Sequence, residues 1–219
     1  MPFKSRQPEG QALDSGVLGV FSRVAAWTGR PAAWRVGHLL GDALGPGKRV
    51  LDIGTGPGTI PLNLARLHSK TQMVGLDISY EMLEKALVHR ERMETFMDFT
   101  AADGEFLPFR ENSMDVVMSL FSLHHMDRPD RLLREVDRVL KPGGELLIID
   151  FRRDMSKGLF FMLNTLWQSV FLFSEGRRGF FDSVRSAWRP EEIEDILKKN
   201  ALTRFSVKWN AMELFVMSR

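Results

Sequence analysis

The sequence has no cysteine among its 219 residues and only five histidines. The lack of cysteine excludes disulfide bonds, zinc–thiolate sites, iron–sulfur clusters and thiol nucleophiles. The histidines form no HxxxH or HExxH spacing, and only His124 and His125 are adjacent. Because metal sites need several such ligands at suitable spacing, we expect no bound metal.

Long apolar runs are also missing. The most apolar stretch, residues 158–173, covers sixteen residues and is interrupted by four polar side chains. It is too short and too polar for a comfortable membrane span. The first eleven residues are polar and carry Lys4, Arg6 and Glu9, so they do not resemble a secretory signal peptide. We therefore expect a cytoplasmic protein without a transmembrane segment.

The remaining composition is typical of a globular protein with a sizeable core, since 44% of the residues are apolar and 26% are charged. The length favours a single domain, residues 1–219. Lysine and arginine number 30 against 28 acidic residues, but the charge is unevenly spread. Residues 49–150 carry −5, residues 1–48 carry +3 and residues 151–219 carry +4. An acidic centre with basic flanks indicates a division of roles along the chain, although a solvated surface of mixed sign is the simpler explanation.

Apolar periodicity predicts alternating strands and helices through the middle of the chain. The predicted strands are residues 49–53, 73–77, 96–101, 114–120, 145–150, 203–209 and 212–217. Ser79 and Asp127 are expected to cap two of the helices, and the helix after Asp127 is expected to stop at residues 142–144. Strands joined by helices favour a mostly parallel sheet covered on both faces, with an antiparallel hairpin at its edge.

The strongest local motif is Val50-Leu51-Asp52-Ile53-Gly54-Thr55-Gly56-Pro57-Gly58-Thr59, a strand followed by a glycine turn and a helix. Glycine lets backbone amides approach a ligand closely. A dinucleotide fingerprint would require glycine at position 59, where this sequence has Thr59. Asp77 ends the next strand, where a carboxylate can accept hydrogen bonds from a ribose diol. A turn that only joins strand to helix is the alternative for the glycine motif.

Further motifs lie near later strand ends, at residues 101–109, 113–126 and 138–144. Together with the glycine motif and Asp77, their order and spacing resemble the class I S-adenosylmethionine-dependent methyltransferases, particularly the group that includes the ubiquinone/menaquinone biosynthesis methyltransferases. The resemblance covers residues 48–151. It implies an α/β, doubly wound, Rossmann-like fold with a seven-stranded, mostly parallel sheet and an antiparallel last strand.

The same resemblance implies the cofactor S-adenosyl-L-methionine, the product S-adenosyl-L-homocysteine and no metal. It assigns the methionine part of the cofactor to Asp52, Gly54, Thr55 and Gly56, with Ser119 beside the amine. It assigns the ribose hydroxyls to Asp77, the adenine faces to Ile78 and Met82, and the adenine edge to Asp103 and Gly104. These positions follow successive strands, where open α/β sheets bind ligands.

Methyl transfer requires a general base only when the attacking atom of the acceptor carries a proton. His124 and His125, which follow the fourth predicted strand, are the candidate bases, and His124 is preferred. The alternative is that both histidines form a local hydrogen-bonded turn before the next helix.

Residues 152–189 are a predicted insertion on the substrate side of the cofactor. Residues 151–189 hold nine of the 22 aromatic side chains, with seven basic and three acidic residues. This composition favours a small, apolar or aromatic and possibly acidic acceptor, contacted by Phe121, Arg152 and Trp167. Two helices that pack on the sheet or on a second subunit are an equal alternative, and peripheral contact with an anionic membrane is a third. The Asn/Asp-Pro-Pro-aromatic motif of nucleic-acid amino-methyltransferases is absent, so we expect no nucleic-acid acceptor.

The chain therefore divides into an N-terminal helical cap (1–47), a cofactor-binding core (48–151), the insertion (152–189) and a final helix with an edge hairpin (190–219). The cap is predicted as two helices over the same site and includes Phe21, Arg23, Trp27, Trp34, Arg35 and His38. The expected function is methyl transfer to a small molecule by a monomer or homodimer. The alternatives are a nicotinamide-dependent oxidoreductase and a non-catalytic S-adenosylmethionine-binding regulatory protein.

Overall fold

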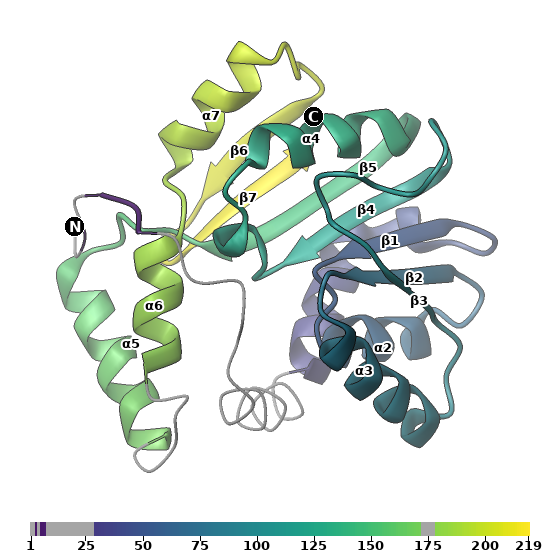
Figure 1. Ribbon diagram of the computed structural model, residues 1–219, viewed down its shortest axis with the longest axis horizontal. Coiled ribbons are helices and arrows are strands. Elements are labelled where there is room, and N and C mark those ends of the chain that lie inside the picture. Colours follow the sequence, from purple (N-terminus) through teal and green to yellow (C-terminus); the bar gives the residue numbers. More distant parts are fainter. Residues whose placement is uncertain (1–2, 4, 8–28, 172–177) are drawn as a thin grey trace.

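The computed structural model describes residues 3, 5–7, 29–171 and 178–219, and its centre is one β-sheet (Figure 1). The strands are β1 (Arg49–Ile53), β2 (Gln72–Asp77), β3 (Asp98–Ala101), β4 (Met114–Leu120), β5 (Leu140–Phe151), β6 (Phe205–Trp209) and β7 (Glu213–Ser218). Their order across the sheet is β3-β2-β1-β4-β5-β7-β6. The strand order reverses between β1 and β4, and ligands of open α/β sheets bind at the C-terminal ends of the strands at such a point.

Strands β1 to β5 pair in parallel, and β7 is inserted antiparallel between β5 and β6. The predicted fold, a seven-stranded and mostly parallel sheet with an antiparallel last strand, is confirmed. The predicted hairpin also forms, because β6 and β7 pair from Phe205 opposite Ser218 to Trp209 opposite Leu214.

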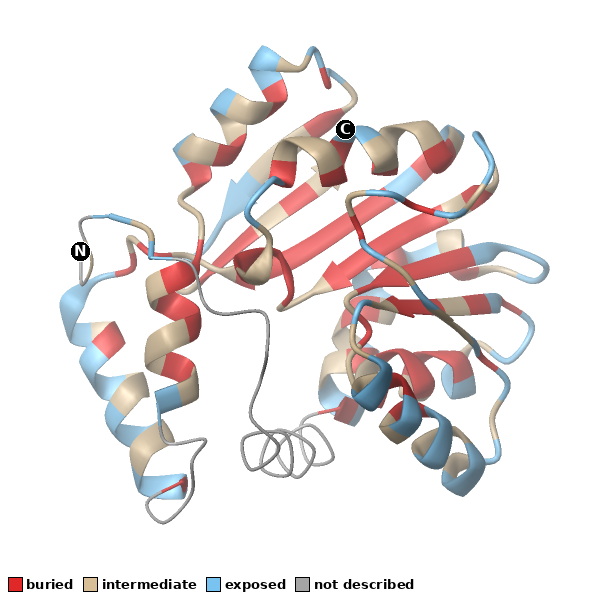
Figure 2. Ribbon diagram, in the orientation of Figure 1, coloured by how far each residue is buried: buried red, intermediate tan, exposed pale blue. Residues whose placement is uncertain are grey.

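Helices connect the strands and cover both faces of the sheet. They are α2 (Thr59–Leu67), α3 (Tyr80–Met93), α4 (Pro129–Val139), α5 (Lys157–Val170), α6 (Gly179–Ser186) and α7 (Pro190–Lys199), with the 3₁₀ helices η1 (Gly41–Leu44) and η2 (Leu123–His125). Neighbouring strand residues enter different cores: Val50 lies in the core formed with α2, and Leu51 in the core formed with α4 and α7. The central strands are therefore buried on both sides, which explains their nearly continuous apolar sequences (Figure 2).

The two predicted helix caps have different outcomes. The Ser79 side chain accepts a hydrogen bond from the N–H of Met82, as expected for the start of α3. The predicted Asp127 cap is wrong, because α4 begins at Pro129 after Arg128 without a side-chain cap. Asp127 instead forms an ion pair with Arg6 at 2.9 Å, a contact between distant segments that the local sequence does not indicate.

Five strands begin elsewhere than predicted, of which β2, β6 and β7 differ by only one or two residues. β3 begins at Asp98, and Phe96 lies outside the sheet with 95% exposure. β5 begins at Leu140, directly after α4, and it includes residues 142–144. A register shift opposite β4 accommodates these residues, so a Pro-Gly-Gly sequence that resembles a helix stop is part of an irregular strand.

Helices α5 and α6 form a small lobe to one side of the sheet (Figure 1). Its core contains Met155, Phe160, Phe180 and Val184. The outer face of α5 carries Phe161, Met162, Leu166 and Val170, each at least 60% exposed. No helix in the described part of the chain has both the length and the apolar character needed to cross a bilayer.

Part of the predicted N-terminal cap is helical, at residues 29–40. Ala33, Val36 and Leu40 are buried in the same core as α2, so this helix packs on the sheet. Arg35 forms two hydrogen bonds of 2.6 Å with the carboxylate of Glu213 on β7. Trp34 is exposed, and its carbonyl lies 3.2 Å from His38 Nδ1. Phe21, Arg23 and Trp27 lie outside the described residues.

Candidate active site

The loop from β1 to α2 contains three glycines with positive φ angles, Gly54 (72°), Gly56 (53°) and Gly58 (72°). L-residues with a side chain rarely adopt this conformation. Gly54 has a second constraint, since a Cβ there would lie 1.9 Å from Ser122 Oγ. Ser122 directly precedes η2, which carries both candidate bases. The glycine loop and the histidine turn are therefore in direct contact.

Four buried oxygen atoms on and near this loop have no hydrogen bond of normal length and angle to the described residues, although the Thr55 hydroxyl lies close to the Asp52 carboxylate: Asp52 Oδ1, Thr55 Oγ1, Thr59 Oγ1 and Ser119 Oγ. Buried polar atoms are usually paired, so this concentration indicates a position for a polar ligand. Burial raises the pKa of Asp52 to about 7; the Thr55 hydroxyl opposes the shift and the charge of Asp77 adds to it. A cationic ligand group beside Asp52 would favour its ionised form.

Asp77 connects the glycine loop to the start of α3. Its Oδ2 accepts a hydrogen bond of 2.7 Å from the N–H of Gly56, and its Oδ1 accepts one of 2.9 Å from Ser79. Burial raises the pKa of Asp77, and these backbone hydrogen bonds oppose the shift. Each carboxylate oxygen has a further lone pair, so Asp77 retains the capacity to bind a ribose diol. Beside it, Ile78 is 55% exposed and Met82 is half-buried, an apolar surface suited to an adenine ring.

The segment after β3 reaches the same edge of the sheet. The exposed carboxylate of Asp103 accepts a hydrogen bond of 2.9 Å from the N–H of Glu105. Gly104 is buried, and a Cβ there would lie 3.0 Å from Ile53 Cγ2. Because Ile53 is the last residue of β1, the candidate adenine-edge residues lie beside the start of the glycine loop.

His124 is buried and held by Asp150, which lies near the C-terminal end of β5. Its Nδ1 is 2.8 Å from Asp150 Oδ1, and its backbone N–H donates a hydrogen bond of 2.8 Å to Oδ2. When Nδ1 donates to this carboxylate, Nε2 is the candidate nitrogen for proton exchange. Burial, with smaller contributions from His124 and Arg6, lowers the pKa of His125 to about 3. His125 is therefore a weak base at neutral pH.

Phe121 is a non-glycine residue with a positive φ angle, 53°, directly after β4. Its ring lies 5.0 Å from the ring of Phe151, which is 5.3 Å from Phe180 and 6.3 Å from His124. Such backbone strain persists only where the surroundings impose it, and it is common at functional sites. Here it aligns an aromatic wall beside the histidine turn.

Arg152 and Trp167, the other two predicted acceptor contacts, interact with other residues of this protein. Arg152 lies where the lobe meets the β6–β7 hairpin, and Trp167 lies within the lobe. Arg152 donates two hydrogen bonds, of 2.7 and 2.6 Å, to Asp154 and one of 2.9 Å to the carbonyl of Asn210. The ring of Trp167 lies 4.5 Å from that of Phe171 and 6.3 Å from that of Phe180. The role of both side chains as acceptor contacts stays a prediction.

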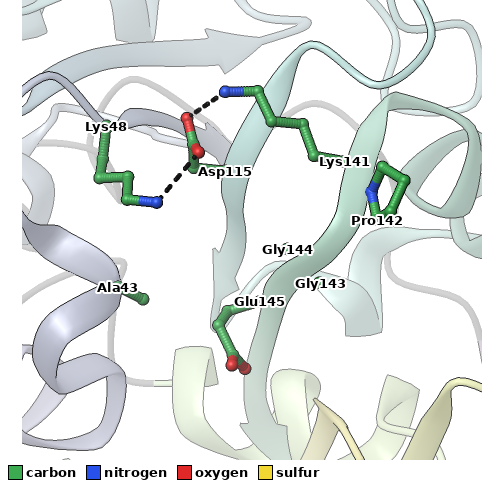
Figure 3. A pocket seen from close by; sticks show the side chains of 8 residues that line it. All are labelled: Ala43, Lys48, Asp115, Lys141, Pro142, Gly143, Gly144 and Glu145. Atoms are coloured by element: carbon green, nitrogen blue, oxygen red, sulfur yellow. Dashed lines mark hydrogen bonds and ion pairs between the residues drawn. The ribbon is translucent and has the colours of Figure 1, made fainter.

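A hollow of about 220 Å³ lies at the opposite, N-terminal ends of β1, β4 and β5 (Figure 3). Asp115 in this hollow forms ion pairs with Lys48 at 3.3 Å and with Lys141 at 2.6 Å. Because these charges satisfy one another and lie away from the C-terminal strand ends, we do not assign the active site to this hollow.

Sequence reasoning missed three residues of the site, Asp150, Ser122 and Thr59. Asp150 follows the apolar run 146–149 at the end of a predicted strand. A carboxylate at this ligand-binding edge of the sheet is itself an indication of a site residue. Ser122 and Thr59 gave no such signal, because their environments depend on contacts between separate loops.

Known proteins match the same part of the chain. The methyltransferase domain family matches residues 51–148, which extend from β1 into β5. The ubiquinone/menaquinone biosynthesis C-methyltransferase UbiE of Ruegeria sp. (strain TM1040) is 31% identical over 154 residues, which cover 65% of this chain and 62% of the relative. The chain is therefore similar to the class I S-adenosylmethionine-dependent methyltransferases, and in particular to the UbiE-like group. The chain spans 44 to 62% of the length of the curated relatives compared with it.

Solved methyltransferases share the fold. An S-adenosylmethionine-dependent methyltransferase from Aquifex aeolicus has a TM-score of 0.66 at 18% identity, over 95% of this chain and 100% of that one. The plantazolicin methyltransferase BpumL, in complex with a monoazolic desmethylPZN analog and SAH, has a TM-score of 0.70 at 14% identity. The match covers 91% of this chain and 86% of BpumL. At these identities the likeness concerns the fold alone.

The residues at this edge of the sheet fit S-adenosylmethionine, the cofactor of the similar class I methyltransferases. The four buried oxygens on and near the glycine loop supply hydrogen-bonding capacity for the methionine part. A Cβ on Gly56 would meet no atom of the described residues within 4 Å, so the loop leaves space there. The nicotinamide-dependent alternative is not favoured, because Thr59 occupies the position of the third glycine of a dinucleotide fingerprint.

Proposed function

We propose that this methyltransferase transfers a methyl group from S-adenosylmethionine to a small aromatic or apolar acceptor, with His124 as the general base. The observation that carries the proposal is the contact between Gly54 and Ser122. It places the histidine turn beside the loop assigned to the methionine part of the cofactor, where the reacting methyl group would lie.

The residues proposed to hold the cofactor come from the ends of four strands. Asp52, the glycine loop and Ser119 would hold the methionine part, Asp77 the ribose, and Ile78, Met82, Asp103 and Gly104 the adenine. S-adenosylmethionine supplies an electrophilic methyl group on a sulfonium. The chain therefore needs mainly to align the acceptor and exclude water.

His124 is proposed to accept the acceptor's proton at Nε2. Asp150 fixes the ring through Nδ1 and stabilises the imidazolium that forms. Phe121 and Phe151 offer a flat apolar surface on which an aromatic ring can pack. Because the UbiE relatives are named for C-methylation in ubiquinone and menaquinone biosynthesis, a hydroquinone ring is the first acceptor to test.

Three further properties stay predictions: a cytoplasmic location, a monomeric or homodimeric state, and peripheral membrane contact. The exposed apolar face of α5 supports membrane contact, because an interfacial helix buries such a face among lipid chains.

The catalytic proposal is tested with His124→Gln and Asp150→Asn, and with His68→Gln at the end of α2 as the control. Transfer of labelled methyl from S-adenosylmethionine to a panel of hydroquinones is measured, together with S-adenosylhomocysteine binding by calorimetry. We expect His124→Gln to lower kcat by about 10²-fold or more. Asp150→Asn should also lower kcat, because the Nδ1 proton and ring orientation are no longer fixed.

Cofactor binding should remain unchanged in all three variants. Wild-type turnover in His124→Gln would contradict the assignment of the base. Tight S-adenosylhomocysteine binding without turnover of any acceptor by the wild-type protein would favour the non-catalytic alternative.

A further inference from the structure

Arg6 is distant in sequence from the matched core, yet its side chain is only 13% exposed. Its guanidinium donates to the carbonyls of Ser186 (2.7 Å), His124 (3.0 Å) and Met126 (3.0 Å) and to Asp127 (2.9 Å). It also lies 4.4 Å from the centre of the Trp188 ring. One cation therefore joins the histidine turn to the end of α6 and the start of α7.

The residues around Arg6 are anchored on the lobe. Phe3 packs edge-on against Phe160 at 5.3 Å and Phe181 at 5.1 Å. The N–H of Gln7 donates to the carbonyl of Arg185 at 3.3 Å. We call residues 3 and 5–7 the N-terminal strap. These contacts fix the strap on both sides of Arg6, so its guanidinium has a defined position.

His124 is consequently held from two directions by opposite charges. Asp150 binds its backbone N–H and its Nδ1, whereas Arg6 binds its carbonyl oxygen. The same Arg6 nitrogen also binds the Met126 carbonyl, at the other end of the turn. A planar guanidinium that bridges two carbonyls restricts the turn more than a single flexible donor would.

We infer that Arg6 is a positioning residue of the methyl-transfer site, which fixes the η2 turn and thereby orients the His124 imidazole. The inference rests on the proposed role of His124 as the base. The methyltransferase domain family matches residues 51–148, so this contribution comes from outside the matched core. The competing explanation is that Arg6 only attaches the strap and contributes to overall stability.

The test compares Arg6→Gln and Arg6→Lys with the control Arg204→Gln in the full-length protein. Arg204 has matched chemistry at the other end of the sheet: it donates to the carbonyls of Lys141 and Gly144, pairs with Asp137 and lies 5.5 Å from the Phe205 ring. The readout is the ¹⁵N chemical shifts of the His124 imidazole in histidine-labelled protein saturated with S-adenosylhomocysteine. His124→Gln identifies the signals.

We expect Arg6→Gln to shift both His124 ring-nitrogen signals, Arg6→Lys to restore part of the shift, and Arg204→Gln to leave them unchanged. Calorimetry should show unchanged S-adenosylhomocysteine affinity in all three, because Arg6 does not contact the glycine loop. In the hydroquinone assay, Arg6→Gln should lower kcat on the order of tenfold without changing KM for S-adenosylmethionine.

Unshifted His124 signals in Arg6→Gln, with a fall in Tm like that of Arg204→Gln, would overturn the inference and leave Arg6 as an anchor. Shifted signals combined with wild-type turnover of His124→Gln would support orientation by Arg6 and overturn His124 as the base. The two failures are therefore distinguishable.

Discussion

Asp52 is 2% exposed, and burial raises its pKa from 3.8 to about 7. Ionisation is thus harder in the folded chain than in the unfolded one. Between pH 4 and 7 the folded chain binds more protons at this residue, so the free energy of unfolding falls as the pH rises through that range. Above about pH 7 both states are ionised and this contribution stays constant.

Asp52→Asn is therefore expected to be more stable than the wild-type protein at pH 8, by at most about 4 kcal/mol. The difference should shrink as the pH falls and nearly vanish at pH 4. Thermal unfolding without cofactor, from pH 4 to 8, measures it, with the exposed Asp98→Asn as the control. A difference independent of pH would contradict the explanation by burial.

Asp77 accepts a hydrogen bond from the glycine loop, and we propose that it also binds the ribose hydroxyls of the cofactor. Asp77→Ala should weaken S-adenosylhomocysteine binding by about 10 to 100-fold, the range expected for hydrogen bonds to a charged group. Ser79→Ala is the matched control, because it removes only the α3 cap, at a cost of about 1 kcal/mol in stability. Calorimetry that finds equal affinity in Asp77→Ala and the wild-type protein would refute the cofactor assignment.

Strand β2 has a glycine, Gly75, in its interior, and the local sequence gives no reason for a glycine at this position. Gly75 pairs with Asp52 on β1 and with Phe99 on β3, and its φ angle is not positive. A Cβ there would lie 2.7 Å from Thr55 Oγ1 and 2.9 Å from both Met97 Cε and Phe99 Cδ1. The strand needs glycine because the cofactor loop folds back against it.

Gly75→Ala should lower the free energy of unfolding by about 1 to 3 kcal/mol, the usual cost of overpacking. It should also weaken S-adenosylhomocysteine binding, because Thr55 must move. Gly158→Ala on α5 is the control, since a Cβ at that position would have no described atom within 4 Å. Chemical denaturation and calorimetry give both quantities, and unchanged affinity in Gly75→Ala would argue against the link between β2 and the loop.

At the scale of the whole molecule, the helix of residues 29–40 is joined to the sheet by the pair Arg35–Glu213, 178 residues apart in sequence. Glu213 is 3% exposed and also accepts a hydrogen bond of 2.8 Å from Asn210. Burial of this carboxylate is costly unless a cation compensates it.

Arg35→Ala should therefore lower the free energy of unfolding by about 2 kcal/mol, less than for a fully buried pair because Arg35 is partly exposed. Arg35→Ala combined with Glu213→Gln should recover part of that loss, since no charge is then left buried. Urea denaturation of the single and double variants gives the coupling energy. Strictly additive losses would show that the two side chains do not stabilise each other.

Much of the fold follows from the sequence. Alternating apolar segments predict the parallel sheet, and the glycine motif identifies the loop after β1, because these signals come from neighbouring residues and fixed backbone requirements. The candidate cofactor residues come from the family resemblance that these motifs carry, and their individual roles stay predictions. The start of β5 was misplaced, since a Pro-Gly-Gly sequence is compatible with both a helix stop and an irregular strand until the pairing with β4 is known.

The histidine turn marks the limit of that reasoning. The sequence by itself determined that two histidines follow β4, at the ligand-binding edge of the sheet. Only the tertiary structure decided that His124 is held by Asp150, that its turn lies against Gly54, and that Arg6 binds the carbonyl oxygens of the turn. Side-chain contacts between segments 26 to 118 residues apart leave no periodic or local signal, because they form only once the sheet has brought the strand ends together.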